Sequence, residues 1–172
     1  MKLTKNINLL IDTVYLIDLK VNKKSQHEKC SLFLKTLIKR KRVNFSISHS
    51  ENYVAFIYSK NKIGIDIEKR NAKNNWSEIA FKKFIDDEKS YGKNCIHKFY
   101  SLWVRKEAIF KAVNDPNKTM FDFYAKKNPV NINNECFYFN KYLFPGFAFV
   151  TCSNVNSKFK LIKLNINDLY NS

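Results

Sequence analysis

Three short β-rich segments follow one another closely, and a chain with this spacing has few ways to fold. They cover residues 43–48, 53–59 and 63–68, and the turn-like sequences SHSEN and SKNK separate them. Such short connections favour strands that run antiparallel to one another. The first twenty residues are rich in β-branched side chains and add one or two further strands.

Helical patterns occur between and after these strands. Ser25 caps a predicted helix over 25–42, with Glu28 three residues later as its capping-box partner. A second helix is predicted over 77–90. A third, over 96–113, ends where Asn-Asp-Pro follows, because proline cannot continue a helix. Further strands are predicted over 120–125, 136–140, 147–152 and 159–165. Helices and antiparallel strands mixed in this way indicate the α+β class.

The net charge favours a polyanionic partner without selecting one. The 172 residues include 31 Lys and Arg against 15 Asp and Glu, a formal net charge of +16. Such a field attracts nucleic acid, anionic lipid, a phosphorylated cofactor or an acidic protein. Gly and Pro number only three each while Lys is abundant, so a coding bias accounts equally well for part of the charge.

The cysteines and the apolar runs indicate a reduced, cytoplasmic protein without a membrane segment. The four cysteines form no CxxC pair and have no histidine at zinc-ligand spacing, so neither a zinc site nor a redox motif is expected. Polar residues interrupt the N-terminal apolar stretch, which favours a strand over a signal peptide. No apolar run approaches the ~20 residues that a membrane span requires.

Two carboxylates lie among isoleucines in KIGIDIE, residues 62–68. Residues two apart on a strand share a face, so Asp66 and Glu68 point the same way and can converge on one ion. An ordinary half-exposed strand with a polar outer face explains the same pattern. The choice depends on what else reaches this face.

The helix over 96–113 supplies a second group of polar side chains. In FYSLWVRKEAIFKAV, Trp103, Glu107 and Lys111 are four residues apart and therefore stack on one helix face. Taken alone, this spacing also fits a solvated Glu–Lys pair beside a core tryptophan, an interaction worth about 0.3 kcal/mol.

Together the two patterns resemble the paired signature of the 4′-phosphopantetheinyl transferase superfamily, in which IGIDIE is followed by W-x-x-K-E-A-x-x-K. FSISHS, residues 45–50, is similar to the Asn-x-Ser-His segment of the larger, surfactin-synthetase-activating type. The F-x-x-x-E spacing of residues 84–88 matches as well. From about residue 28 to its end, the chain can be laid along that type with a compressed middle.

The resemblance implies transfer of the 4′-phosphopantetheine arm of coenzyme A to a serine hydroxyl of an apo carrier protein, with release of adenosine 3′,5′-bisphosphate. It implies that Asp66, Glu68 and Glu107 bind Mg²⁺, or Mn²⁺, through oxygen ligands. Glu107 is also expected to accept the proton of the carrier serine. Lys106 and Lys111 are expected to contact the phosphates, where positive charge stabilises the transition state.

The resemblance also implies a set of residues that bind coenzyme A. His49 and Ser48 are expected to hold its phosphates. The basic run that ends the first predicted helix supplies further cations, namely Lys39, Arg40 and Arg42. This run stands in for a Gly-Lys-Pro segment of the family that is not found here. The chain also has Ser46 where the family usually has Asn, and NDPNK where glycines often follow the KEAxxK helix.

The implied fold consists of two pseudo-symmetric half-domains, each a helix packed on a small antiparallel sheet, with coenzyme A in the cleft between them. We place a shortened N-terminal half-domain at 1–61 and a C-terminal half-domain, with the acidic strand and the WxxKEAxxK helix, at 62–172. Such a compact pseudo-dimer is expected to act as a monomer. Its carrier protein is expected to be acidic, since complementary charge speeds association.

Two alternatives stay open. In a basic nucleic-acid-binding protein, Asp66, Glu68 and Glu107 should be scattered, because carboxylates that face the partner repel its phosphates. A non-catalytic carrier-protein binder of the same fold is compatible with the missing Gly-Lys-Pro segment and with the Ser46 substitution.

Overall fold

The computed structural model describes residues 9–20, 28, 30–32, 34–36 and 43–166, and its strands form two four-stranded sheets. The first sheet has the order β2-β3-β1-β8 and the second the order β4-β7-β6-β5. The strands are β1 (Thr13–Asp18), β2 (Asn44–Ser50), β3 (Tyr53–Ser59), β4 (Ile63–Lys69), β5 (Val130–Ile132), β6 (Glu135–Lys141), β7 (Phe147–Ser153) and β8 (Lys160–Asn165). The predicted α+β class is confirmed.

Most of the helical structure among the described residues follows β4. The helices there are α2 (Trp76–Lys83), α3 (Asp86–Gly92), α4 (Ile96–Val113) and the 3-10 turn η1 (Met120–Asp122). Of the helix predicted over 25–42, the described residues 28, 30–32 and 34–36 are helical. In the part of the chain that the structure describes, no helix combines the length and the apolar character of a membrane span.

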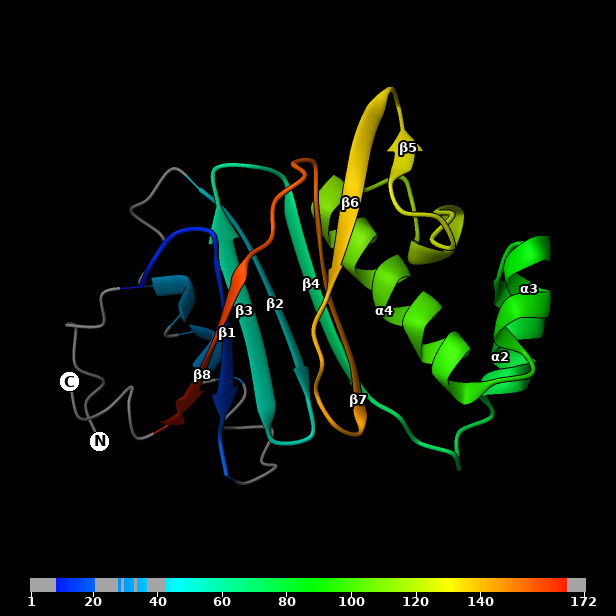
Figure 1. Ribbon diagram of the computed structural model, residues 1–172, viewed down its shortest axis with the longest axis horizontal. Helices are drawn as coiled ribbons and strands as arrows, with labels where there is room; N and C mark the ends of the chain where they lie inside the picture. The colour runs from blue at the N-terminus through cyan, green and yellow to red at the C-terminus, as the bar shows by residue number, and fades with distance from the viewer. Residues whose placement is uncertain (1–8, 21–27, 29, 33, 37–42, 167–172) are drawn as a thin grey trace.

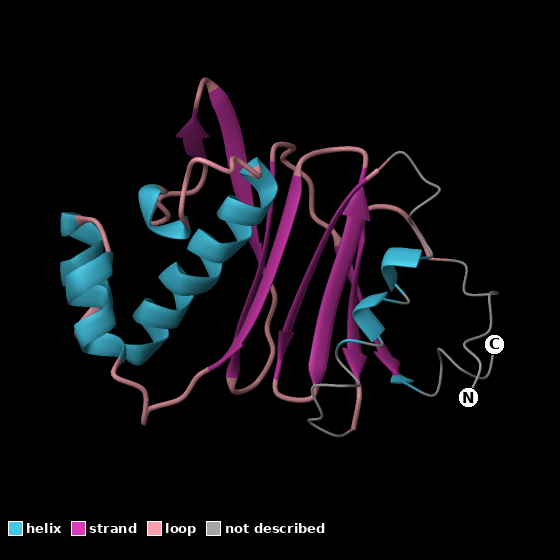
Figure 2. Ribbon diagram, turned by 180° about the vertical axis from the view of Figure 1, so that it is seen from behind, coloured by secondary structure: helices cyan, strands magenta, loops and turns pink. Residues whose placement is uncertain are grey.

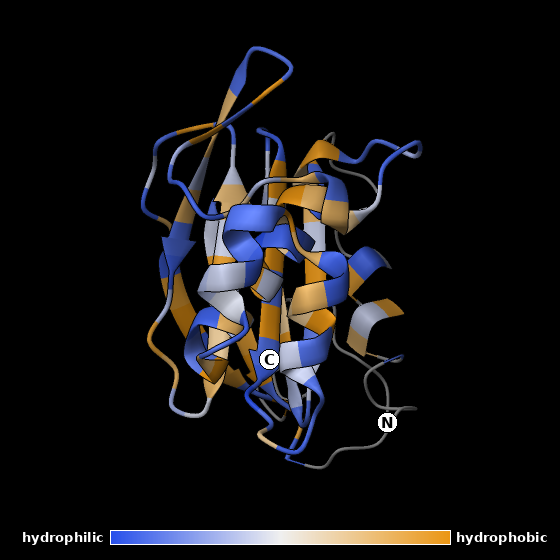
Figure 3. Ribbon diagram, turned by 90° about the vertical axis from the view of Figure 1, so that its right-hand side faces the viewer, coloured by the Kyte–Doolittle hydropathy of each residue, from blue (hydrophilic) through white to orange (hydrophobic). Residues whose placement is uncertain are grey.

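The elements stack in four layers (Figure 1). The described helical residues between 28 and 36 cover the outer face of the first sheet, and the second sheet packs on the inner face of the first. Helix α4 covers the far side of the second sheet, and α2 and α3 pack on α4. Figure 2 shows the same order from behind. Viewed from the α2–α4 side, the strands behind the helices are largely hydrophobic and many of the loops hydrophilic (Figure 3).

Alternating side chains divide the first sheet between two apolar cores. Tyr15 and Ile17 of β1 pack with Leu34 of the N-terminal helix, whereas Val14 and Leu16 point into the core between the two sheets. This alternation follows from the two-residue period of a strand. The isoleucines of β4 complete the inter-sheet core, and a third core lies between the second sheet and α4.

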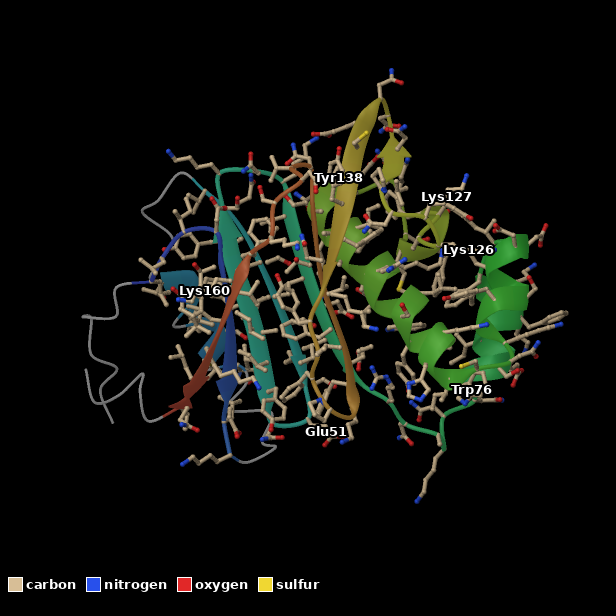
Figure 4. The ribbon with its side chains drawn as sticks, viewed as in Figure 1. Glu51, Trp76, Lys126, Lys127, Tyr138 and Lys160 are labelled. Carbon is tan, nitrogen blue, oxygen red and sulfur yellow. The ribbon has the colours of Figure 1, made fainter. Side chains whose placement is uncertain are left out.

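Strand β8 returns to the first sheet. An antiparallel sheet was predicted, but the first sheet contains one parallel pair of strands. Strand β8 runs parallel to β1, with Val14 opposite Leu161, whereas β1 and β3 are antiparallel. Figure 4 shows Lys160 on β8 beside β1, and Tyr138 on β6 in the second sheet. The sheets thus do not separate at residue 61, because a strand from within 62–172 completes the N-terminal sheet. The division into half-domains stays a prediction.

Two predicted elements were wrong. The helix expected over 77–90 is broken, because the backbone is extended at Phe84 and Ile85 (ψ 158° and 152°), and the buried Phe84 ring stacks on Phe99 with centroids 5.4 Å apart. The strand expected over 120–125 contains η1 instead. The carboxylate of Asp122 accepts hydrogen bonds from both the N–H and the hydroxyl of Thr119, which closes a tight turn.

Candidate active site

A glycine allows α4 to lie directly on β4. A Cβ atom at Gly64 would meet the carbonyl oxygen of Ala108 at 1.8 Å and the amide nitrogen of Ala112 at 2.9 Å. Any side chain at this position would therefore push the helix off the strand. The close approach brings the helix face that carries Glu107 and Lys111 against the strand face that carries Asp66 and Glu68.

Asp66 is buried at the centre of this contact, with 2% of its surface exposed. Its Oδ1 accepts hydrogen bonds from the Ser48 hydroxyl at 2.7 Å and from the Lys111 ammonium at 2.8 Å. Lys111 also donates to the carbonyl oxygen of Ile65 at 3.1 Å, which fixes its ammonium at the strand. The second oxygen of Asp66, Oδ2, is buried and has no hydrogen-bond partner in the described part of the chain.

The other two acids, Glu68 and Glu107, have raised pKa values. Burial, followed by the negative charge of Asp66, raises the pKa of Glu68 to about 7, although Ser50 and Lys111 oppose the shift. Burial and Asp66 also raise the pKa of Glu107. Like charges in a partly desolvated site disfavour ionisation, and a single lysine does not compensate three carboxylates. Perturbed acids that cluster in this way are typical of functional sites.

The three acids are neighbours, but they do not form a finished metal site. Among the described residues, no three His, Cys, Asp or Glu side chains are grouped so that they could hold a metal ion. The predicted three-carboxylate ligand set is therefore not preformed. The chemistry of the donors nevertheless fits a hard dication: all are oxygens, Oδ2 of Asp66 lacks a partner among the described residues, and burial together with the charge of Asp66 raises the pKa values of Glu68 and Glu107.

A row of serines on β2 faces β4. The Ser46 hydroxyl accepts a hydrogen bond from the Ile65 amide at 3.0 Å, and Ser48 and Ser50 accept from the next two alternate amides, those of Ile67 and Lys69, at 3.4 and 2.9 Å. The Ser50 hydroxyl also donates to Oε2 of Glu68 at 3.3 Å. Side chains, not backbone pairs, thus join the adjacent edges of the two sheets.

A pocket of about 520 Å³ opens beside Lys111, within the volume range typical of small-molecule sites. Its walls come from the N-terminal helix, from β2 and from the end of α4, and they consist of Lys35, Phe45, Ser46, Ile47, Phe110, Lys111, Asn114, Asp115 and Pro116. A second hollow of about 360 Å³ shares Phe45, Lys111 and Asn114 with it. Lys111 therefore belongs both to the pocket and to the acid cluster.

Lys106 does not lie at this site, contrary to the prediction. Its ammonium and the Glu88 carboxylate are both fully buried and form an ion pair at 2.6 Å. Lys106 also donates to the carbonyl of Phe123, while Glu88 accepts from the Ala125 amide at 2.6 Å. The pair ties α3 and α4 to the segment after η1, so its place in the structure assigns it to packing and not to phosphate contact.

The residues predicted to bind coenzyme A are distributed differently. Ser48 lies at the acid cluster, but its single hydroxyl proton is donated to Asp66 and not held free for a phosphate. His49 is exposed, and the strand alternation turns it away from the face of Ser48. Lys39, Arg40 and Arg42 lie outside the described residues. Trp103 packs against the helical core.

Sequence reasoning missed the contributions of Gly64, Ser46 and Ser50, as well as Lys35 in the pocket wall. The serines had a visible signal: they alternate in FSISHS, so they share one strand face, and that face is buried. The need for a glycine at position 64 depends on how closely a distant helix approaches, which one strand cannot reveal.

Comparison with known proteins agrees with this geometry. The model of the 4′-phosphopantetheinyl transferase superfamily (ACPS) matches residues 62–152, more than half of the chain. The chain is also similar to the 4′-phosphopantetheinyl transferase gsp of Aneurinibacillus migulanus, at 29% identity over 150 residues that cover 75% of this chain and 60% of that relative. The chain thus spans about 60% of the length of the curated relative it matches. The matched residues include both β4 and α4, and the chain belongs to the 4′-phosphopantetheinyl transferase superfamily.

Proposed function

We propose that this chain transfers the 4′-phosphopantetheine arm of coenzyme A to a serine hydroxyl of an apo carrier protein. One observation carries the proposal: Lys111 pairs with Asp66, its charge acts on Glu68 and Glu107, and it lines a pocket large enough for a small-molecule ligand. In the transfer, the serine oxygen bonds to the phosphorus that carries pantetheine, and the pyrophosphate bond breaks. Adenosine 3′,5′-bisphosphate leaves.

Glu107 is the proposed proton acceptor for the carrier serine. Burial and Asp66 raise the pKa of its carboxyl, which makes the carboxylate a better base near neutral pH than an ordinary glutamate. Lys111 is proposed to stabilise negative charge on the departing phosphate, because it borders both Asp66 and the pocket. Lys35 brings a second cation to the pocket wall.

A divalent cation, Mg²⁺ or Mn²⁺, is part of the proposal. Asp66, Glu68 and Glu107 would hold it, and when bound it would neutralise phosphate charge and act as a Lewis acid. Since Lys111 is paired with Asp66 in this structure, that ion pair has to open or share Asp66 before the carboxylate can bind a metal. Lys111 would then be free to turn toward the pocket.

The experiment incubates the protein with coenzyme A, MgCl₂ and several apo carrier proteins and follows the carrier mass. We expect the phosphopantetheine increment with the wild type and its loss with Glu107→Gln or with EDTA. Glu135→Gln is the matched control, because Glu135 pairs with Lys62 at the surface, on β6. Metal-dependent coenzyme A binding without transfer to any carrier would favour the non-catalytic carrier binder. The absence of both coenzyme A binding and transfer would contradict the proposal.

The nucleic-acid alternative receives no support from the acid cluster. That alternative predicted scattered acids, whereas the charge of Asp66 raises the pKa values of both Glu68 and Glu107, so the three lie close together. An acidic carrier protein, a monomeric enzyme and a cytoplasmic location stay predictions. The charge of +16 supports the first, because a basic enzyme attracts an acidic partner over long range.

A further inference from the structure

The three serines of β2 make two different kinds of contact with β4. All three are buried, and their partners Ile65, Ile67 and Lys69 advance along β4 in the same two-residue steps as the serines advance along β2. The two strands therefore run in the same direction, with hydroxyls between them. Among the described residues, the Ser46 hydroxyl bonds only to a backbone amide, whereas the hydroxyls of Ser48 and Ser50 each bond to an amide and to a carboxylate.

Hydroxyl chemistry gives these contacts a direction. A serine hydroxyl has one proton to donate and two lone pairs that accept. At Ser48 the Ile67 amide occupies an acceptor position, and the proton goes to Oδ1 of Asp66. At Ser50 the Lys69 amide and Oε2 of Glu68 play the same parts. The backbone of β4 thus orients each hydroxyl, and the hydroxyl in turn holds the carboxylate of the residue just before that amide.

We propose that Ser48 and Ser50 are positioning residues, which set the direction of the Asp66 and Glu68 carboxylates from the neighbouring strand, and that Ser46 continues the same row without holding a carboxylate. The inference deepens the proposed function, since the two acids are proposed metal ligands. It also links the acids to the pocket, because β2 supplies both the serine row and the pocket wall of Phe45 and Ile47.

The arrangement contains its own control. Ser46→Ala, Ser48→Ala and Ser50→Ala each remove one hydroxyl that accepts from a β4 amide, so their structural damage is comparable. Only the latter two remove a hydrogen bond to an acid. Partners of metal ligands typically contribute 10- to 100-fold to metal affinity. We therefore expect Mn²⁺ affinity, measured from the free-Mn²⁺ electron paramagnetic resonance signal, to fall about 10-fold in Ser48→Ala and Ser50→Ala. Ser46→Ala should stay close to the wild type.

A second readout needs no metal and therefore separates this inference from the proposed function. With ¹³C-labelled protein at fixed pH, the carboxyl resonance of Asp66 should move in Ser48→Ala and that of Glu68 in Ser50→Ala, while both stay in place in Ser46→Ala. Ser50→Thr, which retains the hydroxyl, should restore the Glu68 resonance.

The outcomes are distinguishable. A wild type that binds no Mn²⁺ would overturn the proposed metal site, and the carboxyl resonances would then decide the positioning role on their own. Equal losses of Mn²⁺ affinity in all three alanine variants, or carboxyl resonances that move alike in all three, would overturn the inference. The serine row would then serve only to join β2 to β4.

Discussion

Burial and Asp66 raise the pKa of Glu68 to about 7 in the folded protein, whereas an ordinary glutamate titrates near 4.5. The folded state therefore binds this proton more tightly than the unfolded state. Between these two pH values the unfolded chain is the one that has released the proton, so the free energy of unfolding falls as pH rises from about 4.5 to about 7. Without divalent cations, Glu68 is thus a destabilising group at neutral pH.

Urea unfolding in EDTA across this pH range tests the assignment. We expect Glu68→Gln to gain stability relative to the wild type as the pH rises toward 7, with the difference levelling off above that pH. Glu135→Gln, which alters a surface carboxylate, should not reproduce this trend. A pH-independent difference between wild type and Glu68→Gln would show that the Glu68 carboxyl has an ordinary pKa.

The buried pair of Lys106 and Glu88 is expected to contribute to stability and not to the chemistry of the site. Lys106→Met leaves a buried carboxylate without its cation, which we expect to cost about 3–5 kcal/mol in free energy of unfolding. The double variant Lys106→Met/Glu88→Leu should recover much of this loss, because neither charge then remains buried. Lys98→Met, at an exposed position of the same helix, serves as control in chemical denaturation.

If Lys106→Met keeps its stability but loses coenzyme A binding, the original interpretation of Lys106 as a phosphate contact is right after all. Lys106 stands next to Glu107 in the motif, but neighbouring residues on a helix point about 100° apart, so it faces α3 while Glu107 faces β4. Glu107 and Lys111, four apart, were correctly predicted to share a face.

At the level of elements, the contact between α4 and β4 determines the site, and Gly64 determines the contact. Gly64→Ala would set a methyl carbon 1.8 Å from the Ala108 carbonyl, and backbone atoms cannot yield as a flexible side chain does. We expect a loss of at least about 1–3 kcal/mol in stability, as overpacked cores show. In a variant that still folds, α4 moves away from β4, and transfer activity falls further than stability alone explains.

Gly92→Ala is the matched substitution. Its Cβ would lie 3.3 Å from ring carbons of Phe84, a contact that a small side-chain movement relieves. Thermal unfolding and transfer assays on the two variants should therefore differ clearly. Equal effects would mean that the helix tolerates a displacement from β4, and that the acids do not depend on this close approach.

Most elements were predicted correctly because their apolar periodicity and the residues at their ends are visible in the local sequence. Helix α4 was predicted over the residues observed, since an apolar face and the following Asn-Asp-Pro mark it, and β2, β3 and β4 were found within two residues. The failures occurred where a tertiary contact decides. Phe84 leaves the helical conformation to reach Phe99, and β5, only three residues long, pairs with β6 without a strong pattern of its own.

At the scale of the whole molecule, the order of the strands was beyond local reasoning. Nothing in residues 160–165 reveals that they pair in parallel with β1, or that β4 leaves its hairpin-like neighbours for another sheet. The acid cluster was predicted, because the family signature spans both elements that form it. The serine row was not, because it needs the placement of one sheet edge against another.

This interleaving predicts that the protein unfolds as one unit. The core between the sheets takes Val14 and Ala55 from one half of the chain and Ile65 and Phe149 from the other, and β8 needs β1 as its neighbour. We expect a single cooperative transition in urea by both fluorescence and circular dichroism. The separate fragments 1–61 and 62–172 should each fail to show one, and mixing them should restore it. Independent folding of 62–172 would instead support autonomous half-domains.

The hydroxyls along β2 have one more effect, on how the molecule behaves in a crowded solution. A strand at the margin of a sheet with free amides is a template on which a second copy of the chain can add its own strand. The amides of Ile65, Ile67 and Lys69 are already engaged by serine oxygens, so β4 has none of these donors left to recruit a neighbour. The same small side chains that orient the acids thus also protect the protein from sheet extension and aggregation at this margin.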